Sequence, residues 1–311
     1  MNTETEEIAE VRAVLSGIKL FWCLDETEYG VTRLGGITNR VFRVDHMGEQ
    51  YVLRLPGKGT ADYVNRVHEE QAARAAAKAK VSPDVVFCDA KAGVLVTRLI
   101  DECVTMSAEK FRSVSGAAGR AGDVLRRLHQ SGAKFPERFD AFEKIAAYSA
   151  LLAKKKVKLP EGFDVALREA EGFQRLLGER PLAPCHCDPF CEDFLDERQT
   201  RMWIVDWEYA GMNDPLWDLG ALSAGGHFSA EQDEYLFAAY FGAPATAADR
   251  GRVMIYKVLS GLVWTLWGLL QHANGNTARS FLGGAERRFD RVKLLMADPA
   301  FFTHVKAAGQ G

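Results

Sequence analysis

The sequence has no uninterrupted apolar run that approaches the ~18 residues from which a membrane-spanning helix is recognised. Its N-terminal residues, MNTETEEIAEVRAVL, are acidic and amphipathic, and they lack the basic segment and apolar core of a signal peptide. We therefore expect a cytoplasmic protein without a membrane span.

An excess of positive charge is also absent, because 39 Lys and Arg residues stand against 42 Asp and Glu residues. The resulting net charge of −3 provides no long-range attraction for nucleic acid or for an anionic membrane surface. We expect neither as a partner. At 311 residues the chain is long enough for two domains or lobes with a substantial core.

Cysteine is scarce, with six residues at positions 23, 88, 103, 185, 187 and 191. This is well below the density of a disulfide-rich scaffold, so free thiols are expected. Three of the cysteines surround His186 and invite a zinc interpretation. Structural zinc sites usually need two separated ligand pairs, and no second pair follows at such a spacing. We expect small buried side chains around a tight loop instead.

What the sequence does contain is a stretch with three acidic residues, Asp188, Asp193 and Asp206. The first two lie on a loop after an apolar strand at 181–185, and the third ends a second apolar strand at 202–205. We predict that a turn at 197–200 joins these strands. The three carboxylates should then converge in one cleft.

Converging carboxylates raise one another's pKa unless cations lie among them. Mg²⁺ takes oxygen ligands, usually one or two carboxylates together with substrate phosphates. The pattern therefore indicates a magnesium-dependent phosphoryl-transfer site, with Asp188 as the base near the acceptor hydroxyl and Asp206 as the metal ligand. Acidic residues at loop ends also cap helices or face water, and this simpler interpretation stays open.

The segment from Tyr29 to Leu55 reads as three β-strands. Gly35 and Gly36 lie between the first two strands, just before Thr38 and Asn39. A glycine pair at this place lets backbone N–H groups approach phosphate oxygens closely. Most such pairs are merely turns, so the signal is weak by itself.

Arg54 lies in the middle of the third, apolar strand, where a charge is seldom buried unless it is paired. A helix predicted at 61–80 carries Glu69. An Arg54–Glu69 ion pair would hold the strand cation over nucleotide phosphates, as a lysine–glutamate pair does in kinases. The alternative is a surface salt bridge of little energetic value.

The rest of the chain is predicted to be mainly helical. A β-hairpin is expected at 85–99, and after Ser107 the helical pattern is broken mainly around Cys185. Helices are expected at 107–131, 139–156, 161–178, 229–242, 247–272 and 277–296.

Taken together, these features resemble the choline/ethanolamine kinases of the bacterial type, within the aminoglycoside-phosphotransferase-like group of the protein-kinase fold. The resemblance spans residues 30 to 275, and the last of its motifs favours the choline-kinase branch. It rests on Gly35-Gly36-x-Thr38-Asn39, Tyr51-Val52-Leu53-Arg54, Asn65-Arg66-x-x-Glu69, Leu125-x-x-Leu128-His129, His186-x-Asp188 and Ile204-Val205-Asp206-Trp207-Glu208-Tyr209-Ala210-Gly211.

The resemblance implies an α+β, bilobal protein-kinase-like fold that uses ATP and Mg²⁺. A small β-rich N-terminal lobe, residues 1–100, would bind the nucleotide. A larger, mainly helical C-terminal lobe, residues 101–311, would carry the catalytic loop and the acceptor site. The crossover between the lobes contacts adenine in such kinases, so the candidate hinge residues are Thr97, Arg98, Leu99 and Ile100.

The resemblance also implies roles for single residues. Asp188 would be the catalytic base and Asp206 a magnesium ligand. Arg54 and Glu69 would form the phosphate-positioning pair. Asp218, in Trp217-Asp218-Leu219-Gly220, would brace the catalytic loop from a following helix.

Asp193 departs from the family pattern, in which this position of the catalytic loop is an asparagine that binds the second metal. An aspartate can still ligate Mg²⁺, but it adds negative charge and cannot donate a hydrogen bond. We therefore expect Asp193 to be a catalytic metal ligand, with room for weakened activity or an altered demand for metal.

An acceptor pocket is indicated by Trp264 and Trp267, which share one face of a helix at i and i+3. With Tyr209 and the negative charge of Glu208, they could form an aromatic cage that binds a quaternary ammonium group by cation–π attraction. Core packing is the alternative for tryptophans at this spacing. The resemblance favours the cage, and Gln271, one turn further, is a candidate neighbour.

We therefore predict ATP- and magnesium-dependent phosphoryl transfer to the hydroxyl of choline, which gives phosphocholine and ADP. Ethanolamine, thiamine or an aminoglycoside are alternative small-molecule acceptors. A second alternative is a catalytically weak pseudokinase that binds a choline-type ligand, and Asp193 is the residue that supports it. The sequence does not predict the oligomeric state.

Overall fold

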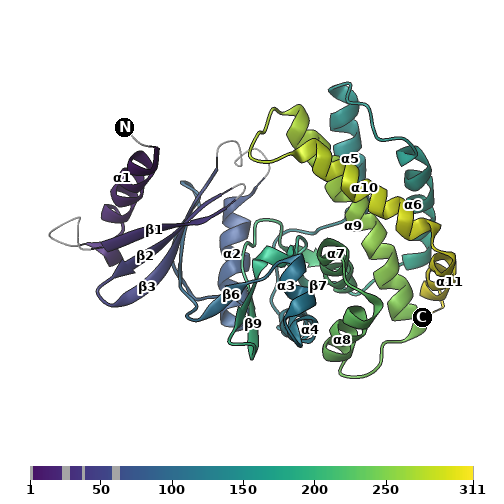
Figure 1. The fold of residues 1–311 in the computed structure, drawn as a ribbon, viewed down its shortest axis with the longest axis horizontal. Helices are drawn as coiled ribbons and strands as arrows, with labels where there is room; N and C mark the ends of the chain where they lie inside the picture. Colours follow the sequence, from purple (N-terminus) through teal and green to yellow (C-terminus); the bar gives the residue numbers. More distant parts are fainter. Residues whose placement is uncertain (1–2, 23–28, 37–38, 58–63, 311) are drawn as a thin grey trace.

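The computed structural model describes residues 3–22, 29–36, 39–57 and 64–310. Figure 1 shows a β-rich N-terminal part at one end of the molecule and a mainly helical C-terminal part at the other. Each part has its own cluster of buried apolar side chains. A division near residue 100 remains our proposal for the boundary between the two lobes.

The N-terminal part is built on a five-stranded antiparallel sheet with the strand order β1-β2-β3-β5-β4. Alternating side chains of β2 and β3, among them Phe42, Val44 and Leu53, are buried against the helix α1 (Thr3–Ser16). The strands are β1 (Tyr29–Gly35), β2 (Arg40–His46), β3 (Glu49–Leu55), β4 (Val85–Asp89) and β5 (Val94–Arg98).

Helix α2 (Arg66–Lys78) connects the sheet to the helical part of the molecule. It begins later than the predicted residue 61, because the side chain of Asn65 caps its first turn by accepting from the N–H groups of Val67 and His68 at 3.2 and 3.3 Å. Residues 61–63 lie outside the described residues. The alanine face of α2, including Ala72 and Ala76, belongs to the core of the helical part, while α2 also contacts β4 of the sheet.

The C-terminal part contains more helices than we predicted. The expected helix at 107–131 is wrong as a single element, because Gly116 has a φ of +70° and separates α3 from α4. The helices α7 and α11 were not among the predicted ranges. The helices are α3 (Ala108–Ser113), α4 (Ala117–His129), α5 (Ala141–Lys154), α6 (Phe163–Leu177), α7 (Leu216–Gly226), α8 (Ala230–Phe241), α9 (Ala247–Ala273), α10 (Phe281–Ala297) and α11 (Pro299–Ala308).

The strands around Cys185 pair differently from our prediction. Strand β7 (Ala183–Cys185) pairs with β10 (Gly211–Asn213), and the predicted turn at 197–200 instead joins β8 (Phe194–Glu197) to β9 (Arg201–Ile204). Strand β6 (Cys103–Thr105) completes the second small sheet.

The strand β8 was missed because one of its inward-facing residues is Asp196, and a buried charge is atypical of a strand. This carboxylate is 2% exposed and forms an ion pair with Arg120, in which Nη2 and Oδ2 are 2.6 Å apart. The ion pair compensates for the burial of the aspartate. The missed strand therefore explains the wrong pairing.

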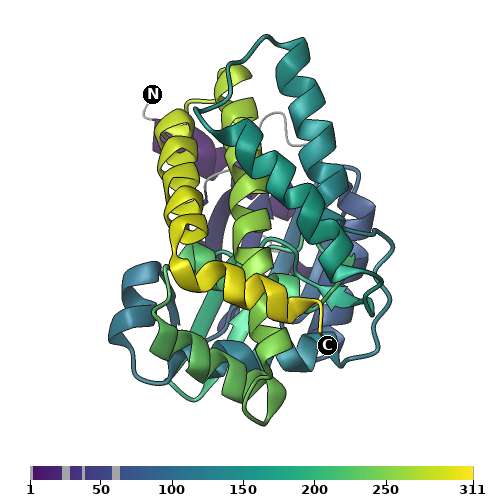
Figure 2. The same ribbon diagram turned by 90° about the vertical axis from the view of Figure 1, so that its right-hand side faces the viewer.

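Helix α9 runs the length of the helical part, with α10 alongside it (Figure 2). Among the described residues it is the one helix that has the length and composition of a membrane span. However, 83% of its apolar window is buried inside the protein. These properties are those of a core helix, around which α5, α7, α10 and α11 pack.

Candidate active site

The loop after β7 is held by the buried carboxylate of Asp218, near the start of α7. Asp218 accepts from the backbone N–H groups of His186 at 2.7 Å and Cys187 at 2.9 Å, and it lies 3.0 Å from Nε2 of His129. Its side chain is fully buried, and its oxygens have three hydrogen-bonding partners. Asp218 on α7 therefore holds the backbone of the loop that carries Asp188, as we predicted.

The backbone at Cys187 turns sharply just before Asp188. Its φ of +70° is in the left-handed region, which costs energy for a residue with a Cβ. Nε1 of Trp217 donates to the Cys187 carbonyl at 2.8 Å and helps to hold this conformation. The neighbouring His186 packs on Trp207, and burial lowers the pKa of the imidazole, so it is neutral while Nε2 donates to the Val205 carbonyl.

The carboxylates of Asp188, Asp193 and Asp206 act on one another electrostatically. Burial, followed by the charges of Asp206 and Glu208, raises the pKa of Asp188 well above its ordinary value. Burial and the charges of Asp206 and Asp188 do the same for Asp193. Burial also raises the pKa of Asp206. This convergence of negative charge favours a bound cation.

Asp193 and Asp206 are brought to the same cleft by the backbone between β7 and β9. The N–H of Val205 donates to the Asp193 carbonyl at 3.0 Å, and the Asp193 side chain accepts from the Phe190 N–H at 3.1 Å. Asp206 itself has a φ of +70° at the end of β9. A strained aspartate is typical of a site in which the carboxylate must point in one direction.

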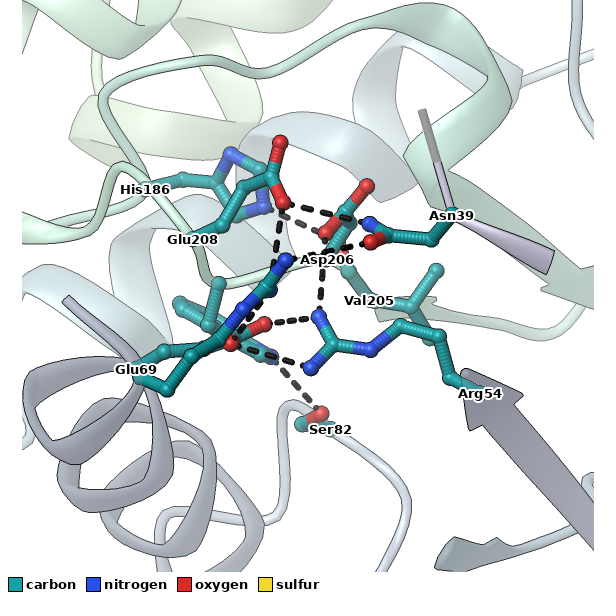
Figure 3. Close-up of polar contacts among 10 residues, drawn as sticks. Asn39, Arg54, Glu69, Ser82, His186, Val205, Asp206 and Glu208 are labelled. Carbon is teal, nitrogen blue, oxygen red and sulfur yellow. Dashed lines mark hydrogen bonds and ion pairs between the residues drawn. The ribbon is translucent and has the colours of Figure 1, made fainter. Parts of the chain in front are cut away.

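An ion pair between β3 and α2 lies next to Asp206 in this site, as Figure 3 shows. Both terminal nitrogens of Arg54 contact the carboxylate of Glu69, with Nη2 and Oε2 3.0 Å apart. Nη1 of Arg54 also lies 3.9 Å from Oδ1 of Asp206. Burial would raise the pKa of Glu69, but Arg54 and then Arg66 lower it below the ordinary value. The predicted Arg54–Glu69 pair is therefore present and buried.

Arg66 is a member of this network that our sequence analysis did not assign to the site. Its guanidinium lies 2.8 Å from Glu69, 3.4 Å from Glu208 and 3.2 Å from the side-chain oxygen of Asn39. The amide of Asn39 donates to Glu208 at 3.1 Å (Figure 3). The motif Asn65-Arg66-x-x-Glu69 could have indicated that Arg66 belongs to this network, because an arginine in the first turn of a helix reaches a glutamate three residues later.

Glu208 therefore lies with Asn39 and Arg66, and the structure does not bring it to the aromatic residues as we had expected. Burial and the charge of Asp206 raise its pKa to about 7. Its carboxylate oxygen lies with those of Glu69 and Asp206 in a group whose members are within 4.8 Å of one another. Carboxylate oxygens at this separation fit a hard divalent cation such as Mg²⁺.

Among the described cysteines, Cys185 alone belongs to a comparable group of donor atoms. Cys88, Cys103, Cys185, Cys187 and Cys191 are free thiols, and Cys23 lies outside the described residues. Cys185 meets two other donor groups, those of His129 and Asp218, within 4.8 Å. Both oxygens of that aspartate already accept the hydrogen bonds that hold the loop.

The predicted phosphate loop is described only in part, because Thr38 lies outside the described residues. Gly35 and Gly36 have φ values of +144° and +110°, a region that side chains with a Cβ rarely adopt. A Cβ on Gly36 would lie 1.9 Å from the carbonyl oxygen of Asn39. Glycine is therefore required at position 36.

At the candidate hinge, two of the four N–H groups are already used within the protein. Arg98 donates to the carbonyl of Asp84 at 2.9 Å, and Leu99 donates to that of Gln50 at 3.0 Å. The Thr97 backbone lies in the ladder between β3 and β5. Contacts with adenine would then come from the carbonyl groups of this segment and from Ile100.

The aromatic residues gather as predicted, but they are tightly packed. The ring of Trp264 lies 5.3 Å from that of Tyr209 and 6.0 Å from that of Trp267, with Phe190 at 6.1 Å. The two tryptophans are only 5% and 7% exposed. Trp264 borders a cavity that it shares with Asp188.

Trp267 and Gln271 have partners from the chain itself. The guanidinium of Arg279 lies 5.8 Å from the ring centroid of Trp267, where a cationic substrate was expected. Gln271 accepts from Asn276 at 3.1 Å near the end of α9. Of the two predicted tryptophans, Trp264 is therefore the one that borders a cavity together with Asp188.

Comparisons with known proteins now place the chain in a family. Residues 30–254 match the model of the phosphotransferase enzyme family. The crystal structure of a choline/ethanolamine kinase family protein from Mesorhizobium loti is 50% identical, with a TM-score of 0.89 over 97% of this chain and 99% of that one. The chain belongs to the choline/ethanolamine kinase family of phosphotransferases.

More distant relatives of this choline/ethanolamine kinase family member include the LicA proteins. Protein LicA of Haemophilus influenzae is 26% identical and aligns with 90% of this chain and 84% of its own length. The choline kinase LicA of Streptococcus pneumoniae is 25% identical, with a TM-score of 0.75 over 92% of this chain and 98% of that one. The predicted family, the bilobal kinase-like fold and an enzyme of the phosphotransferase type are thereby confirmed.

Proposed function

We propose that this enzyme transfers the γ-phosphoryl group of ATP to the hydroxyl of choline, giving phosphocholine and ADP, in the cytoplasm. The observation that carries the proposal is the cavity that Asp188 and Trp264 line together. A base and an aromatic face on one cavity suit an acceptor with a hydroxyl at one end and an ammonium group at the other. Membership of the family supplies the reaction class.

In the proposed reaction, Asp188 orients the acceptor hydroxyl and accepts its proton as the oxygen attacks the γ-phosphorus. The bond from the γ-phosphorus to the bridging oxygen breaks, and ADP leaves. The raised pKa of Asp188 suits this role, because a base is most effective when its pKa approaches the working pH. Arg54, held by Glu69, would position the nucleotide phosphates from the opposite wall.

A magnesium site fits the carboxylates that face the nucleotide side of the cleft. Asp206 and Asp193 would hold the ion, with Glu208 close to Asp206. When bound, Mg²⁺ supplies positive charge that neutralises the phosphate oxygens. Without an ion these carboxylates repel one another, and burial raises the pKa values of Asp193 and Asp206, so a divalent cation would stabilise their charged forms.

Magnesium should stabilise the protein more at pH 8 than at pH 5.5. The folded-state pKa of Glu208 is about 7, above its ordinary value of 4.5, so without metal the free energy of unfolding falls as the pH rises between these values. Mg²⁺ binds the deprotonated carboxylates and reverses this loss. Thermal unfolding with and without MgCl₂ measures the effect. Asp206→Asn should abolish most of the shift, and an equal shift at both pH values would contradict the site.

The acceptor end of the cavity can be tested with Trp264→Ala. We expect the KM for choline to rise about 30-fold, because a lost cation–π contact costs about 2 kcal/mol when the site is desolvated, while the KM for ATP stays within twofold. Trp203→Ala is the matched control, since that half-buried indole stacks on Arg201 in the small sheet. Equal increases of both KM values would remove Trp264 from the acceptor site.

A second candidate, a weakly active choline-binding pseudokinase, is favoured by Asp193 alone. Its carboxylate adds to the negative charge around Asp188 and Asp206. If this charge limits catalysis, Asp193→Asn should raise kcat at limiting Mg²⁺. If Asp193 instead supports catalysis as a metal ligand, the same substitution should lower kcat. Measuring kcat against Mg²⁺ concentration for both forms separates the two candidates.

A further inference from the structure

One arginine, Arg66, joins three parts of the chain that lie far apart in the sequence. It belongs to the first turn of α2, where its Nη1 lies 2.8 Å from Oε2 of Glu69 on the same helix. The same nitrogen lies 3.4 Å from Glu208, which follows β9, and Nη2 donates at 3.2 Å to the side-chain oxygen of Asn39, which precedes β2. The side chain of Arg66 is only 9% exposed. A single guanidinium therefore connects the sheet, α2 and the loop after β9.

These contacts close a ring that fixes the amide of Asn39. Because the amide oxygen accepts from Arg66, the amide nitrogen faces Glu208, to which it donates at 3.1 Å (Figure 3). Arg66 also contacts that carboxylate directly, so each member of the ring has the other two as partners. Asn39 is tightly placed as well, since its carbonyl oxygen would lie 1.9 Å from a Cβ on Gly36. The place of Asn39 beside the predicted phosphate loop is therefore tied to Arg66.

Arg66 also supplies charge to a group of carboxylates in the cleft. The oxygens of Glu69, Asp206 and Glu208 lie within 4.8 Å of one another. Arg54 pairs with Glu69 and lies 3.9 Å from Asp206, so it serves two of the three. Among the residues that the structure describes, Arg66 is the one cation within 4.0 Å of the third, Glu208. Without Arg66, Glu208 would be a buried carboxylate beside two like charges, which would displace it from its present position.

Stabilisation of α2 alone does not account for this arrangement. An ion pair at i and i+3 on a helix needs only the contact between Arg66 and Glu69, and such pairs contribute little. The more exposed pair of Arg74 with Glu70, on the same helix, is of that kind. Arg66 differs because it also bonds to Asn39 and Glu208, which lie beside the proposed phosphate and magnesium sites.

We propose that Arg66 is a positioning residue for the phosphoryl donor, which holds Asn39 against Glu208 and so sets where the nucleotide phosphates lie relative to the metal ligands. The inference rests on the proposed phosphotransferase function and adds a residue to the nucleotide side of the same site. Arg66 acts through its partners, because its donors are directed at them. It does not line the cavity that Asp188 shares with Trp264. Its loss should therefore affect the use of ATP and leave the binding of choline unchanged.

Arg66→Met tests the proposal, because methionine is also unbranched but has neither a charge nor a hydrogen-bond donor. Steady-state ADP release should show a KM for Mg-ATP that is at least 10-fold higher, because charge-assisted hydrogen bonds are lost, while the KM for choline stays within twofold. Arg66→Lys should raise the KM for Mg-ATP at least threefold but less than Arg66→Met does. It keeps the charge without the flat fork that reaches several groups at once. Equal increases of both KM values would overturn the proposal.

Arg74→Met is the matched control, since it removes the same groups from the same helix but breaks only the more exposed pair with Glu70. It should leave both KM values within twofold. Thermal unfolding of each variant separates positioning from folding, because a purely structural Arg66 predicts a lower Tm with an unchanged KM for Mg-ATP. Should Arg66→Met fail to fold, Arg66→Lys decides, and a KM for Mg-ATP within twofold of the unmodified enzyme would overturn the proposal.

Asn39→Ala tests whether Arg66 acts through the ring. Residues that act through one another have effects that do not combine independently. The increase in the KM for Mg-ATP in the double variant with Arg66→Met should therefore be at least about fivefold smaller than the product of the two single increases. Effects that multiply would show that Arg66 does not act through Asn39, and would overturn the proposed ring.

Nucleotide binding distinguishes a failure of this inference from a failure of the proposed function. If no acceptor supports ADP release, the choline kinase activity fails, but calorimetry with the non-hydrolysable ATP analogue AMP-PNP and MgCl₂ needs no acceptor. Arg66→Met should then weaken the binding of AMP-PNP at least 10-fold, and Arg74→Met should leave the affinity within twofold. Equal affinity of Arg66→Met and the unmodified protein would overturn the positioning role.

Discussion

Asp188→Asn is expected to lower kcat by about 10²–10⁴-fold, the usual contribution of a positioned general base. Asparagine keeps the shape of the side chain but cannot accept the hydroxyl proton. The folded state should not suffer, because burial and the charges of Asp206 and Glu208 already disfavour the ionised form of Asp188. We therefore expect an unchanged or slightly higher Tm and little change in the KM for ATP.

Steady-state ADP release and thermal unfolding of the same preparation measure both parts of this prediction. Glu192→Gln is a suitable control, since Glu192 is an exposed carboxylate on the same loop. It should leave kcat within about twofold of the unmodified enzyme. A kcat for Asp188→Asn within 10-fold of the unmodified enzyme would remove Asp188 from the role of base.

Asp218→Ala is expected to cause the largest loss of stability, with the free energy of unfolding lowered by about 3–5 kcal/mol. The substitution would leave the N–H groups of His186 and Cys187 and the ring of His129 without their common partner. Buried donors without partners are costly, and the loop backbone would also lose the support that aims Asp188. Urea unfolding at equilibrium measures the loss.

Asp290→Ala is the control for removing a carboxylate at the surface. The pair that Asp290 forms with Lys293 is exposed, so its loss should cost at most about 1 kcal/mol. Should Asp218→Ala fail to fold, Asp218→Asn retains one acceptor oxygen and should be measurable. That variant should show a reduced kcat with an unchanged KM for ATP. A loss below 1 kcal/mol for Asp218→Ala, with normal kcat, would contradict the bracing role.

The parts of the site that the sequence predicted are those in which local patterns carry a strong physical constraint. A charged residue on an apolar strand needs a partner, and Arg54 has one in Glu69. The motif residues Asp188 and Asp206 follow apolar strands, and their carboxylates interact as expected. These inferences needed only the alternation of apolar residues and the chemistry of single side chains.

The directions in which side chains point, and their partners far away in the sequence, could not be predicted in the same way. Glu208 and Tyr209 are adjacent in the sequence, yet one bonds to Asn39 and the other packs on Trp264. The sequence predicts a helix at 277–296, but nothing local to it reveals that α10 packs against α9 and lines the cavity beside Asp188. Asp196 concealed the strand β8, since its partner, Arg120, lies far away in the sequence.

ADP release with Mg-ATP and a panel of choline, ethanolamine, thiamine and kanamycin tests the central claim most directly. We expect turnover with choline, with or without turnover of ethanolamine, because a cavity of about 280 Å³ beside Asp188 suits a small amine alcohol. Kanamycin should give no signal above that of ATP alone. Release of ADP with kanamycin only, or with none of the four acceptors, would contradict the proposed choline kinase activity.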